Sequence, residues 1–440
     1  MKRVILALAA ASLLSGCGIF RGDGRPKTPT VGERIPVLGA DSRIEVDPGL
    51  ANIPVTVPGP IVNGDWAQSG GNAAKSLGHV ALPDALTQAW SVSIGEGSSN
   101  RARLVAEPVV ANGRVYTIDT TATARAFDER TGAQLWATQL LGAQNVQRSA
   151  LFGGGVAVEG GRLYASNGLG YAFALDANTG AIQWQVRPGG PLRGAPTLGG
   201  DNVYVVSQDN QIFALNPANG ETRWTSAGSF ELANVFGTAA PAFAQSTVVA
   251  GYSSGELTAY RYENGQVVWQ DALARTAVST VVGALSDIDA DPVIDNGRVF
   301  AIGQGGRMVA VELITGQRVW ELNAAGISTP WVAGDWVFAV TDQAQLLAVS
   351  RATGRVRWMA QLPRFRDAED RQGPIFWRGP VLAGNRLVLT GSNGQIIFVS
   401  PADGRVLSTL QTQGSFSLAP VVANNTLFVL DNAGRLTAWR

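Results

Sequence analysis

One short phrase recurs along most of the chain: Thr or Asn, then Gly, then three variable residues, then Trp. Its six complete copies end at Trp136, Trp184, Trp224, Trp269, Trp320 and Trp358. A seventh copy at Asp403 and Gly404 has Ser408 where the Trp would fall. Because one spacing is kept through six copies, we expect a series of equivalent structural units rather than unrelated domains.

A second marker opens each unit. In seven units a proline is followed eight positions later by an aromatic or aliphatic residue, and these prolines are Pro108, Pro196, Pro241, Pro292, Pro330, Pro380 and Pro420. One further unit lacks the proline and has Val156 and Tyr164 in the two places. The eight openings are about 45 residues apart, which is the length of one four-stranded propeller blade.

Within a unit, the residues alternate as they do in strands. Val115 and Thr117 fall on one face of such a run, and Tyr116 and Ile118 fall on the other. Asn-Gly and Asp-Gly pairs supply the positive φ values that two-residue hairpin turns require. Each unit is therefore predicted to form four short antiparallel strands.

The last unit reaches Arg440 after its third strand. Residues 86–94 form a strand-like run around Trp90 and have no opening strands of their own, so they can supply the missing fourth strand. The predicted fold class is all-β: an eight-bladed β-propeller over residues 61–440, closed by an N-terminal strand. A closed ring leaves no long unpaired sheet edge.

One tryptophan per blade indicates a structural joint. A ring needs the same contact many times, whereas a ligand site needs differing groups that converge. Each indole can bury roughly 200 Å² against the next blade and donate its N–H to a backbone carbonyl. The residues predicted to dock the blades are Trp90, Trp136, Trp184, Trp224, Trp269, Trp320 and Trp358.

The residue counts exclude several kinds of chemistry. With one Cys and one His, the chain has no internal disulfide, no Cys-rich zinc site and no multi-His metal centre. A Ser-His-Asp mechanism would depend on His79, which lies in no nucleophile-elbow pattern and is expected to be structural. Basic and acidic residues number 34 each, so no nucleic acid partner is expected. No catalytic or metal-binding residue is predicted.

The N-terminus carries an export signal. Two basic residues precede an apolar run over residues 4–14, which is too short to span a bilayer and suits a signal peptide. The segment that ends at Cys17 resembles a bacterial lipobox, so residues 1–16 are predicted to be removed and Cys17 to be lipidated. The alternative is a general secretory signal with a chance Cys. The Pro-rich residues 17–60 are expected to form a flexible tether.

Two family resemblances follow from these features. The repeat resembles the propeller repeat of pyrroloquinoline-quinone (PQQ) dehydrogenases. A lipobox followed by an eight-bladed propeller resembles the BamB family, the lipoproteins of the outer-membrane β-barrel assembly machine, over about residues 61–440. That resemblance implies a non-enzymatic scaffold without a cofactor, which binds the periplasmic domains of a BamA-like barrel subunit and assists unfolded outer-membrane proteins. Gly18 after the lipidated Cys, where an Asp would retain the protein in the inner membrane, implies the periplasmic face of the outer membrane.

The resemblance also implies partner-binding residues. The segment 285–292 looks like the acidic loop through which the family contacts the barrel subunit, and Asp287 and Asp289 match its two acidic positions. Carboxylates at i and i+2 of an extended segment point to one side. A neighbouring contact loop would include Val235 and Phe236, although the family pattern has an Arg where Phe236 stands and a larger aliphatic residue where Ala233 stands.

Two alternatives stay open. A PQQ-dependent quinoprotein dehydrogenase would have a vicinal Cys pair and a calcium site, but the single Cys lies in the lipobox. The acidic loop is a poor calcium loop, because Pro292 replaces the required Gly and Arg298 stands where the closing Glu belongs. A periplasmic ligand-binding propeller is the third possibility, because every propeller has a central funnel.

Overall fold

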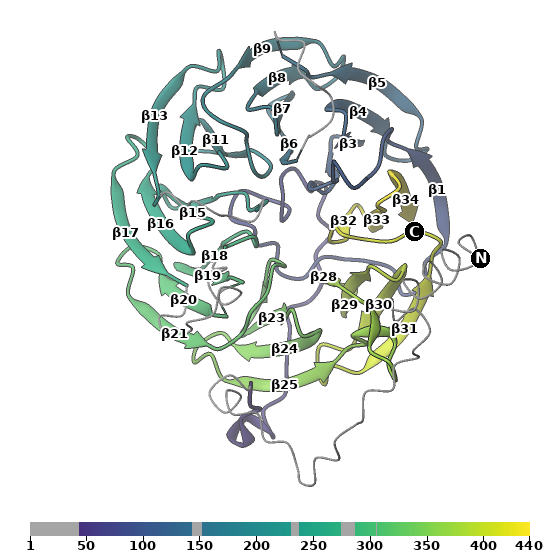
Figure 1. Ribbon diagram of the computed structural model, residues 1–440. Coiled ribbons are helices and arrows are strands. Elements are labelled where there is room, and N and C mark those ends of the chain that lie inside the picture. The colour runs from purple at the N-terminus through teal and green to yellow at the C-terminus, as the bar shows by residue number, and fades with distance from the viewer. Residues whose placement is uncertain (1–43, 143–151, 230–236, 274–286, 305) are drawn as a thin grey trace, which may run out of the picture. The chain divides into compact units, whose positions relative to one another are not determined.

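Eight four-stranded antiparallel sheets follow one another around a ring, and each sheet is one blade of a β-propeller (Figure 1). The computed structural model describes residues 44–142, 152–229, 237–273, 287–304 and 306–440. The chain divides into two units, Met1–Arg43 and Ile44–Arg440, and all described residues belong to the second. The predicted fold class, an all-β propeller with eight blades, is confirmed.

The strands of the first four blades run from the axis of the ring outward in chain order. Blade one comprises β2 (Val109–Ala111), β3 (Arg114–Ile118), β4 (Thr123–Asp128) and β5 (Gln134–Gln139). Blade two comprises β6 (Gly154–Glu159), β7 (Arg162–Asn167), β8 (Ala172–Asp176) and β9 (Ile182–Val186). Blade three comprises β10 (Thr197–Gly199), β11 (Asn202–Val206), β12 (Gln211–Leu215) and β13 (Thr222–Ala227). Blade four comprises β14 (Ala242–Ala244), β15 (Thr247–Gly251), β16 (Glu256–Arg261) and β17 (Val267–Ala272).

The next three blades keep the same order. Blade five comprises β18 (Val293–Asp295), β19 (Arg298–Ile302), β20 (Met308–Glu312) and β21 (Arg318–Leu322). Blade six comprises β22 (Trp331–Ala333), β23 (Trp336–Val340), β24 (Gln345–Ser350) and β25 (Val356–Gln361). Blade seven comprises β28 (Trp377–Ala383), β29 (Arg386–Gly391), β30 (Gln395–Val399) and β31 (Val406–Gln411). A two-stranded hairpin, β26 (Phe365–Asp367) and β27 (Gln372–Pro374), lies between blades six and seven in the sequence.

Blade eight combines strands from the two ends of the described chain. It comprises β32 (Val421–Ala423), β33 (Thr426–Leu430), β34 (Arg435–Trp439) and, as its outer strand, β1 (Gln88–Ser93). β1 pairs antiparallel with β34, so that Ser91 lies opposite Thr437 and Val92 opposite Leu436. The sheet of blade eight therefore joins residues that are about 350 positions apart in the sequence.

The strands differ in burial with their distance from the axis. Inner strands such as β2 are fully buried, because they are covered on both faces by neighbouring blades. Outer strands such as β5 are largely exposed, and their central tryptophan is the buried residue. The turn between β2 and β3 has positive φ angles at both Asn112 (53°) and Gly113 (73°), as a two-residue hairpin requires.

Residues 63–80, termed the axial segment, cross the ring near its centre (Figure 1). Hydrogen bonds join this segment to every blade, at Val110, Val158, Leu198, Phe243, Ile294, Trp331, Leu382 and Asn424. Trp66 is 2% exposed and stacks on Trp331 at 5.9 Å between ring centroids. The axial segment therefore closes one mouth of the central channel.

Residues 44–60 lie against blade six. They include the 3₁₀ helix η1 (Pro48–Leu50), and Asp47 donates its backbone N–H to the carbonyl of Val356 at 2.8 Å. Arg357 donates to the carbonyl oxygens of Ala51 and Ile53, both at 2.7 Å. This part of the predicted tether differs from the flexible chain expected there, because its backbone groups pair with the outer strand β25 (Val356–Gln361).

Candidate partner-binding site

The seven repeat tryptophans lie at the joints between blades. Each indole is 6–9% exposed and donates its N–H to a backbone carbonyl of the following blade. The acceptors, in the order of the tryptophans from Trp90 to Trp358, are the carbonyls of Glu129, Ala177, Pro217, Tyr262, Leu313, Arg351 and Pro401. These indoles hold the ring together and leave no face free for a ligand.

The glycine of the repeat is the second half of the same joint. Gly132 has a φ of +74°, and a Cβ at this position would lie 2.8 Å from the Trp90 ring. The Gly of one blade therefore receives the Trp of the preceding blade. Ser408 is exposed on β31, and buried apolar residues of blades seven and eight, such as Leu387 and Val421, belong to one core cluster.

The acidic loop of blade five is tied to a buried arginine of blade three. Arg193 is fully buried, and its Nη2 lies 2.8 Å from Oδ1 of Asp287, which is 1% exposed. The same nitrogen lies 3.9 Å from Oδ1 of Asp289, whose side chain is 12% exposed. The two carboxylates thus point to one side, as their spacing predicts, and share one guanidinium.

This charge arrangement is unbalanced, because two carboxylates face one cation. Burial and the neighbouring Asp287 raise the pKa of Asp289 to about 6, although Arg193 and Arg378 oppose the shift. The Oδ2 atom of Asp289 accepts a hydrogen bond from Gln304 at 2.7 Å. Asp289 is therefore the more exposed and the less fully neutralised of the two acids.

Gly237 makes room for the guanidinium. A Cβ at this position would lie 1.7 Å from Nη2 of Arg193 and 2.5 Å from Oδ1 of Asp289. Three blades therefore meet here: Arg193 from blade three, Gly237 from blade four and the acidic loop from blade five. A side chain at position 237 would separate the cation from the acids.

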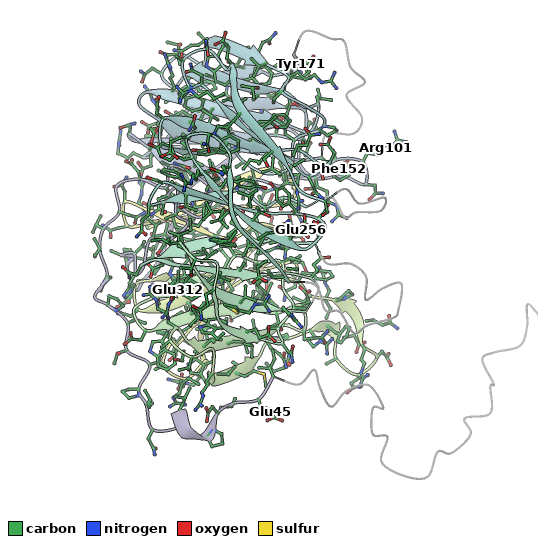
Figure 2. All side chains as sticks on the ribbon, turned by 90° about the vertical axis from the view of Figure 1, so that its left-hand side faces the viewer. Glu45, Arg101, Phe152, Tyr171, Glu256 and Glu312 are labelled. Atoms are coloured by element: carbon green, nitrogen blue, oxygen red, sulfur yellow. The ribbon has the colours of Figure 1, made fainter. Side chains whose placement is uncertain are left out.

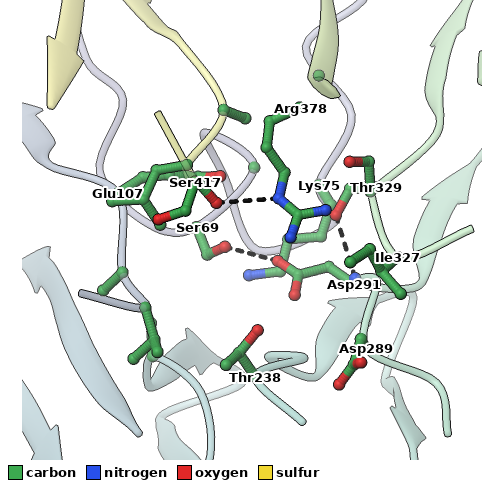
Figure 3. Close-up of a pocket in the computed structure, with 18 of the residues that line it drawn as sticks. Ser69, Lys75, Glu107, Thr238, Asp289, Asp291, Ile327, Thr329, Arg378 and Ser417 are labelled. Atoms are coloured by element: carbon green, nitrogen blue, oxygen red, sulfur yellow. Dashed lines mark hydrogen bonds between the residues drawn. The ribbon is translucent and has the colours of Figure 1, made fainter. Parts of the chain in front are cut away.

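The acidic loop also borders a cavity of about 430 Å³ on the axis of the ring (Figure 3). The segments that lead into the inner strands of all eight blades contribute to its wall, and the axial segment contributes Trp66, Ser69 and Lys75. Arg101 and Phe152, from two of these leading segments, lie on the same side of the ring (Figure 2). The site is thus a funnel with a closed floor and a rim of loops.

Charged side chains from several blades converge in this cavity. Asp291 accepts hydrogen bonds from Ser69 at 2.6 Å and from the backbone N–H of Ala240 at 2.7 Å. Lys75 is 2% exposed and lies 3.2 Å from Thr197 Oγ1; burial lowers its pKa, while Asp291 and Glu107 oppose that shift. Burial raises the pKa of Asp291.

Three of the predicted functional residues lie outside the described residues: Cys17, Val235 and Phe236. Asp287 and Asp289 are described and lie together. Arg193, Lys75 and Arg378 were not singled out from the sequence, because each lies outside the repeat motif. They come from blade three, the axial segment and blade seven, respectively. One feature of the sequence points to such a cation. The family pattern has an Arg where this chain has Phe236, so a cation that pairs with the two acids must come from another position.

His79 has a structural role. Its Nδ1 donates to the carbonyl of Pro58 at 2.6 Å, and its Nε2 accepts from the backbone N–H of Asn385 at 2.9 Å. Among the described residues, no group of three or more His, Cys, Asp or Glu has a metal-binding arrangement. The same part of the chain contains no helix that is long and apolar enough to cross a membrane.

Comparison with known proteins gives a consistent family. Residues 120–360 and 365–439 match the family described as outer membrane protein assembly factor BamB. The relative of that description from Escherichia coli K12 is 28% identical over 349 residues, which cover 78% of this chain and 86% of the relative. The relative from Moranella endobia is 25% identical over 355 residues, with coverages of 79% and 89%.

Solved structures share the fold. BamB from Moraxella catarrhalis has a TM-score of 0.68 at 20% identity, and the match covers 81% of this chain and 100% of that one. A europium-containing methanol dehydrogenase has a TM-score of 0.65 at 14% identity, with coverages of 83% and 89%. At these identities the likeness establishes the propeller fold alone. It does not distinguish the assembly factors from the dehydrogenases.

Proposed function

Because the chain belongs to the BamB family of outer membrane protein assembly factors, we propose that it is a scaffold that binds the periplasmic domains of a BamA-like barrel subunit. The chain is an assembly factor and not an enzyme, since the dehydrogenases are neighbours in fold alone. Lipidation at Cys17 would hold the propeller at the periplasmic face of the outer membrane, where it assists the insertion of unfolded outer-membrane proteins.

The observation that carries the proposed contact is the shared guanidinium of Arg193. Asp287 and Asp289 both face this one cation, so Asp289, whose side chain is 12% exposed, keeps a negative charge that its 3.9 Å ion pair compensates only in part. A basic side chain of the partner would neutralise it and form charge-assisted hydrogen bonds with Asp289. Asp287 would act beneath the surface, because its ion pair with Arg193 fixes the loop that presents Asp289.

Val235 and Phe236 belong to the same proposal as an apolar neighbour of the acidic site. They immediately precede Gly237, which touches Arg193 and Asp289. Aromatic residues are enriched in interface cores, so Phe236 is the proposed apolar anchor of the contact.

The proposal is tested by titrating purified variants against the periplasmic domains of the barrel subunit. Asp289→Arg is expected to weaken binding by more than Asp289→Asn, and by about tenfold or more, because like charges then meet. Asp287→Asn is expected to lower the melting temperature, since it leaves Arg193 buried without its closest partner.

Asp335→Arg is the matched control. Asp335 is an exposed carboxylate on the turn that joins β22 to β23. This turn follows the inner strand of blade six, whereas the acidic loop precedes the inner strand of blade five. Its reversal is expected to leave the affinity unchanged. Unchanged affinity in folded Asp289→Arg would remove this residue from the contact.

A further inference from the structure

The axial cavity contains a cation and an anion that have no ion-pair partner within 4 Å among the described residues. Arg378, in β28 (Trp377–Ala383), donates from Nε to the carbonyl of Ser417 at 2.9 Å. No hydrogen bond from its two terminal nitrogens, and no carboxylate within 4 Å, is found among the residues that the structure describes. Its side chain extends into the pocket (Figure 3). A guanidinium has five N–H donors, so most of this group's binding capacity is unused.

Glu107 is the complementary group. It lies in the segment leading into blade one and lines the cavity, and the backbone N–H groups of Gly70 and Ala419 act to lower its pKa. Within the described ranges it has no cation within 4 Å. Burial and the nearby Asp291 raise its pKa to about 7, although the charge of Lys75 opposes the shift.

The other charges of the cavity are already engaged. Asp291 accepts from Ser69 and from Ala240, and Asp289 accepts from Gln304 and lies beside Arg193. Lys75 contacts Thr197 and is close enough to Asp291 and Glu107 for their charges to act on it. Arg378 and Glu107 thus lie in a common space, and neither has an ion-pair partner within 4 Å among the described residues. The charges of Asp342, Asp289 and Glu107 act on Arg378 from longer range.

The rest of the wall is largely apolar. Leu104, Ile327, Trp331 and Leu418 line the cavity, and the Trp66 ring stacked on Trp331 forms part of its floor. The volume of about 430 Å³ lies in the range of small-molecule sites, which combine apolar walls with a few convergent polar groups.

We propose that the axial cavity binds a small zwitterion of dipeptide size, whose carboxylate pairs with Arg378, whose ammonium group pairs with Glu107 and whose apolar side chain lies against the wall. Such a molecule supplies the missing partner of each group at once. Binding a carboxylate alone would leave Glu107 buried without a cation, and binding an amine alone would leave Arg378 without an anion. This site goes beyond the proposed scaffold function and shares neither of its two charged residues with the partner contact.

Calorimetric titration of the mature protein tests the proposal, with glycyl-leucine as the probe. Two capped probes separate the charges: N-acetyl-glycyl-leucine lacks the ammonium group, and glycyl-leucinamide lacks the carboxylate. Glycyl-leucine is expected to bind with one site per chain and about tenfold more tightly than either capped probe, because charged hydrogen bonds in a dry site are strong. No binding at about 10 mM probe, or equal binding of all three probes, would overturn the proposal.

Variants assign the two ends of the probe. Arg378→Gln is expected to lose about tenfold in affinity for glycyl-leucine and to leave the binding of glycyl-leucinamide unchanged. Glu107→Gln is expected to show the reverse preference, with the loss confined to probes that carry the ammonium group. Arg378→Lys keeps the charge and is expected to retain part of the affinity, which keeps the test valid if Arg378→Gln does not fold.

Arg366→Gln is the matched control, because Arg366 is an exposed arginine on the hairpin strand β26 and does not line the cavity. It is expected to bind all probes as the wild type does. Wild-type affinity in a folded Arg378→Gln protein would exclude Arg378 as the carboxylate site.

Discussion

Glu107 stands at the wall of the axial cavity, where burial opposes the ionisation of its carboxyl group. Its pKa of about 7 in the folded protein exceeds the value of 4.5 for an ordinary glutamate. The folded chain therefore holds this proton more tightly than the unfolded chain. The stability that the protonated group contributes is fully present below about pH 4.5 and is lost as the pH rises through about 7.

Glu107→Gln is expected to remove this dependence. At pH 8 the variant should unfold at a higher temperature than the wild type, because a neutral amide replaces a buried anion. The gain in the free energy of unfolding is at most about 3 kcal/mol, and less where water in the cavity screens the charge. Melting curves recorded between pH 5 and pH 8, at intervals of about one unit, measure the difference, which should shrink as the pH falls.

Glu263→Gln serves as the control, since Glu263 is exposed on the turn that follows β16. Its melting temperature should run parallel to that of the wild type across the same range. If the curves of Glu107→Gln were also parallel, Glu107 would not be a destabilising anion in the folded protein.

The sequence predicts the structural contacts of some residues and not of others. Trp136 could be assigned to a joint because its contact is repeated in six other blades, and repetition is visible in a sequence. Arg193 could not be assigned, because its ion pair with Asp287 joins positions that are 94 residues apart and occurs once. Gly132 is visible in the sequence as part of the repeated phrase, whereas its contact with the Trp90 ring depends on the angle between two blades.

At the scale of elements, the N-terminal part of the described chain has two different functions in the ring. β1 completes the sheet of blade eight, and the axial segment bonds to all eight blades across the channel. β1 was predictable from its alternation around Trp90. The axial segment was not, because its hydrogen bonds fall at irregular intervals and give no period of two or of 3.6 residues.

Three truncations separate these functions. A chain of residues 44–440 is expected to melt like the mature protein, since it keeps every described contact. A chain of residues 82–440 should keep the ring but melt at a lower temperature, because loss of buried Trp66 alone typically costs about 3–5 kcal/mol. A chain of residues 95–440 also lacks β1 and should aggregate through the unpaired edge of β34.

Thermal melting and size-exclusion chromatography of the three chains measure this order. The comparison of the two shorter chains decides the role of β1, because both lack the axial segment. A monomeric 95–440 chain that melts together with 82–440 would show that the ring does not depend on its N-terminal strand.

At the scale of the whole molecule, the same ring serves proteins with different functions. The propeller of this chain matches BamB from Moraxella catarrhalis at a TM-score of 0.68 and the methanol dehydrogenase at 0.65. The fold therefore fixes the joints and the central channel, and function depends on the groups placed at the rim and in the channel. In this chain we propose that those groups are the acidic loop beside Arg193 and the charges that surround the axial cavity.

Attachment to the membrane is the remaining property of the whole molecule, and we predict that it depends on Cys17. The two or three acyl chains of a lipidated Cys give stable anchoring, whereas one chain gives marginal binding. Cys17→Ser is expected to remain uncleaved at the inner membrane or to appear in the soluble periplasmic fraction.

Gly18→Asp keeps the lipid and changes the sorting residue, so it should move the protein to the inner membrane. Separation of the two membranes on a density gradient, followed by immunoblotting, distinguishes these outcomes. Retention of Cys17→Ser in the outer membrane would show that the propeller has a second anchor, and the contact around Asp289 would then be the first place to look for it.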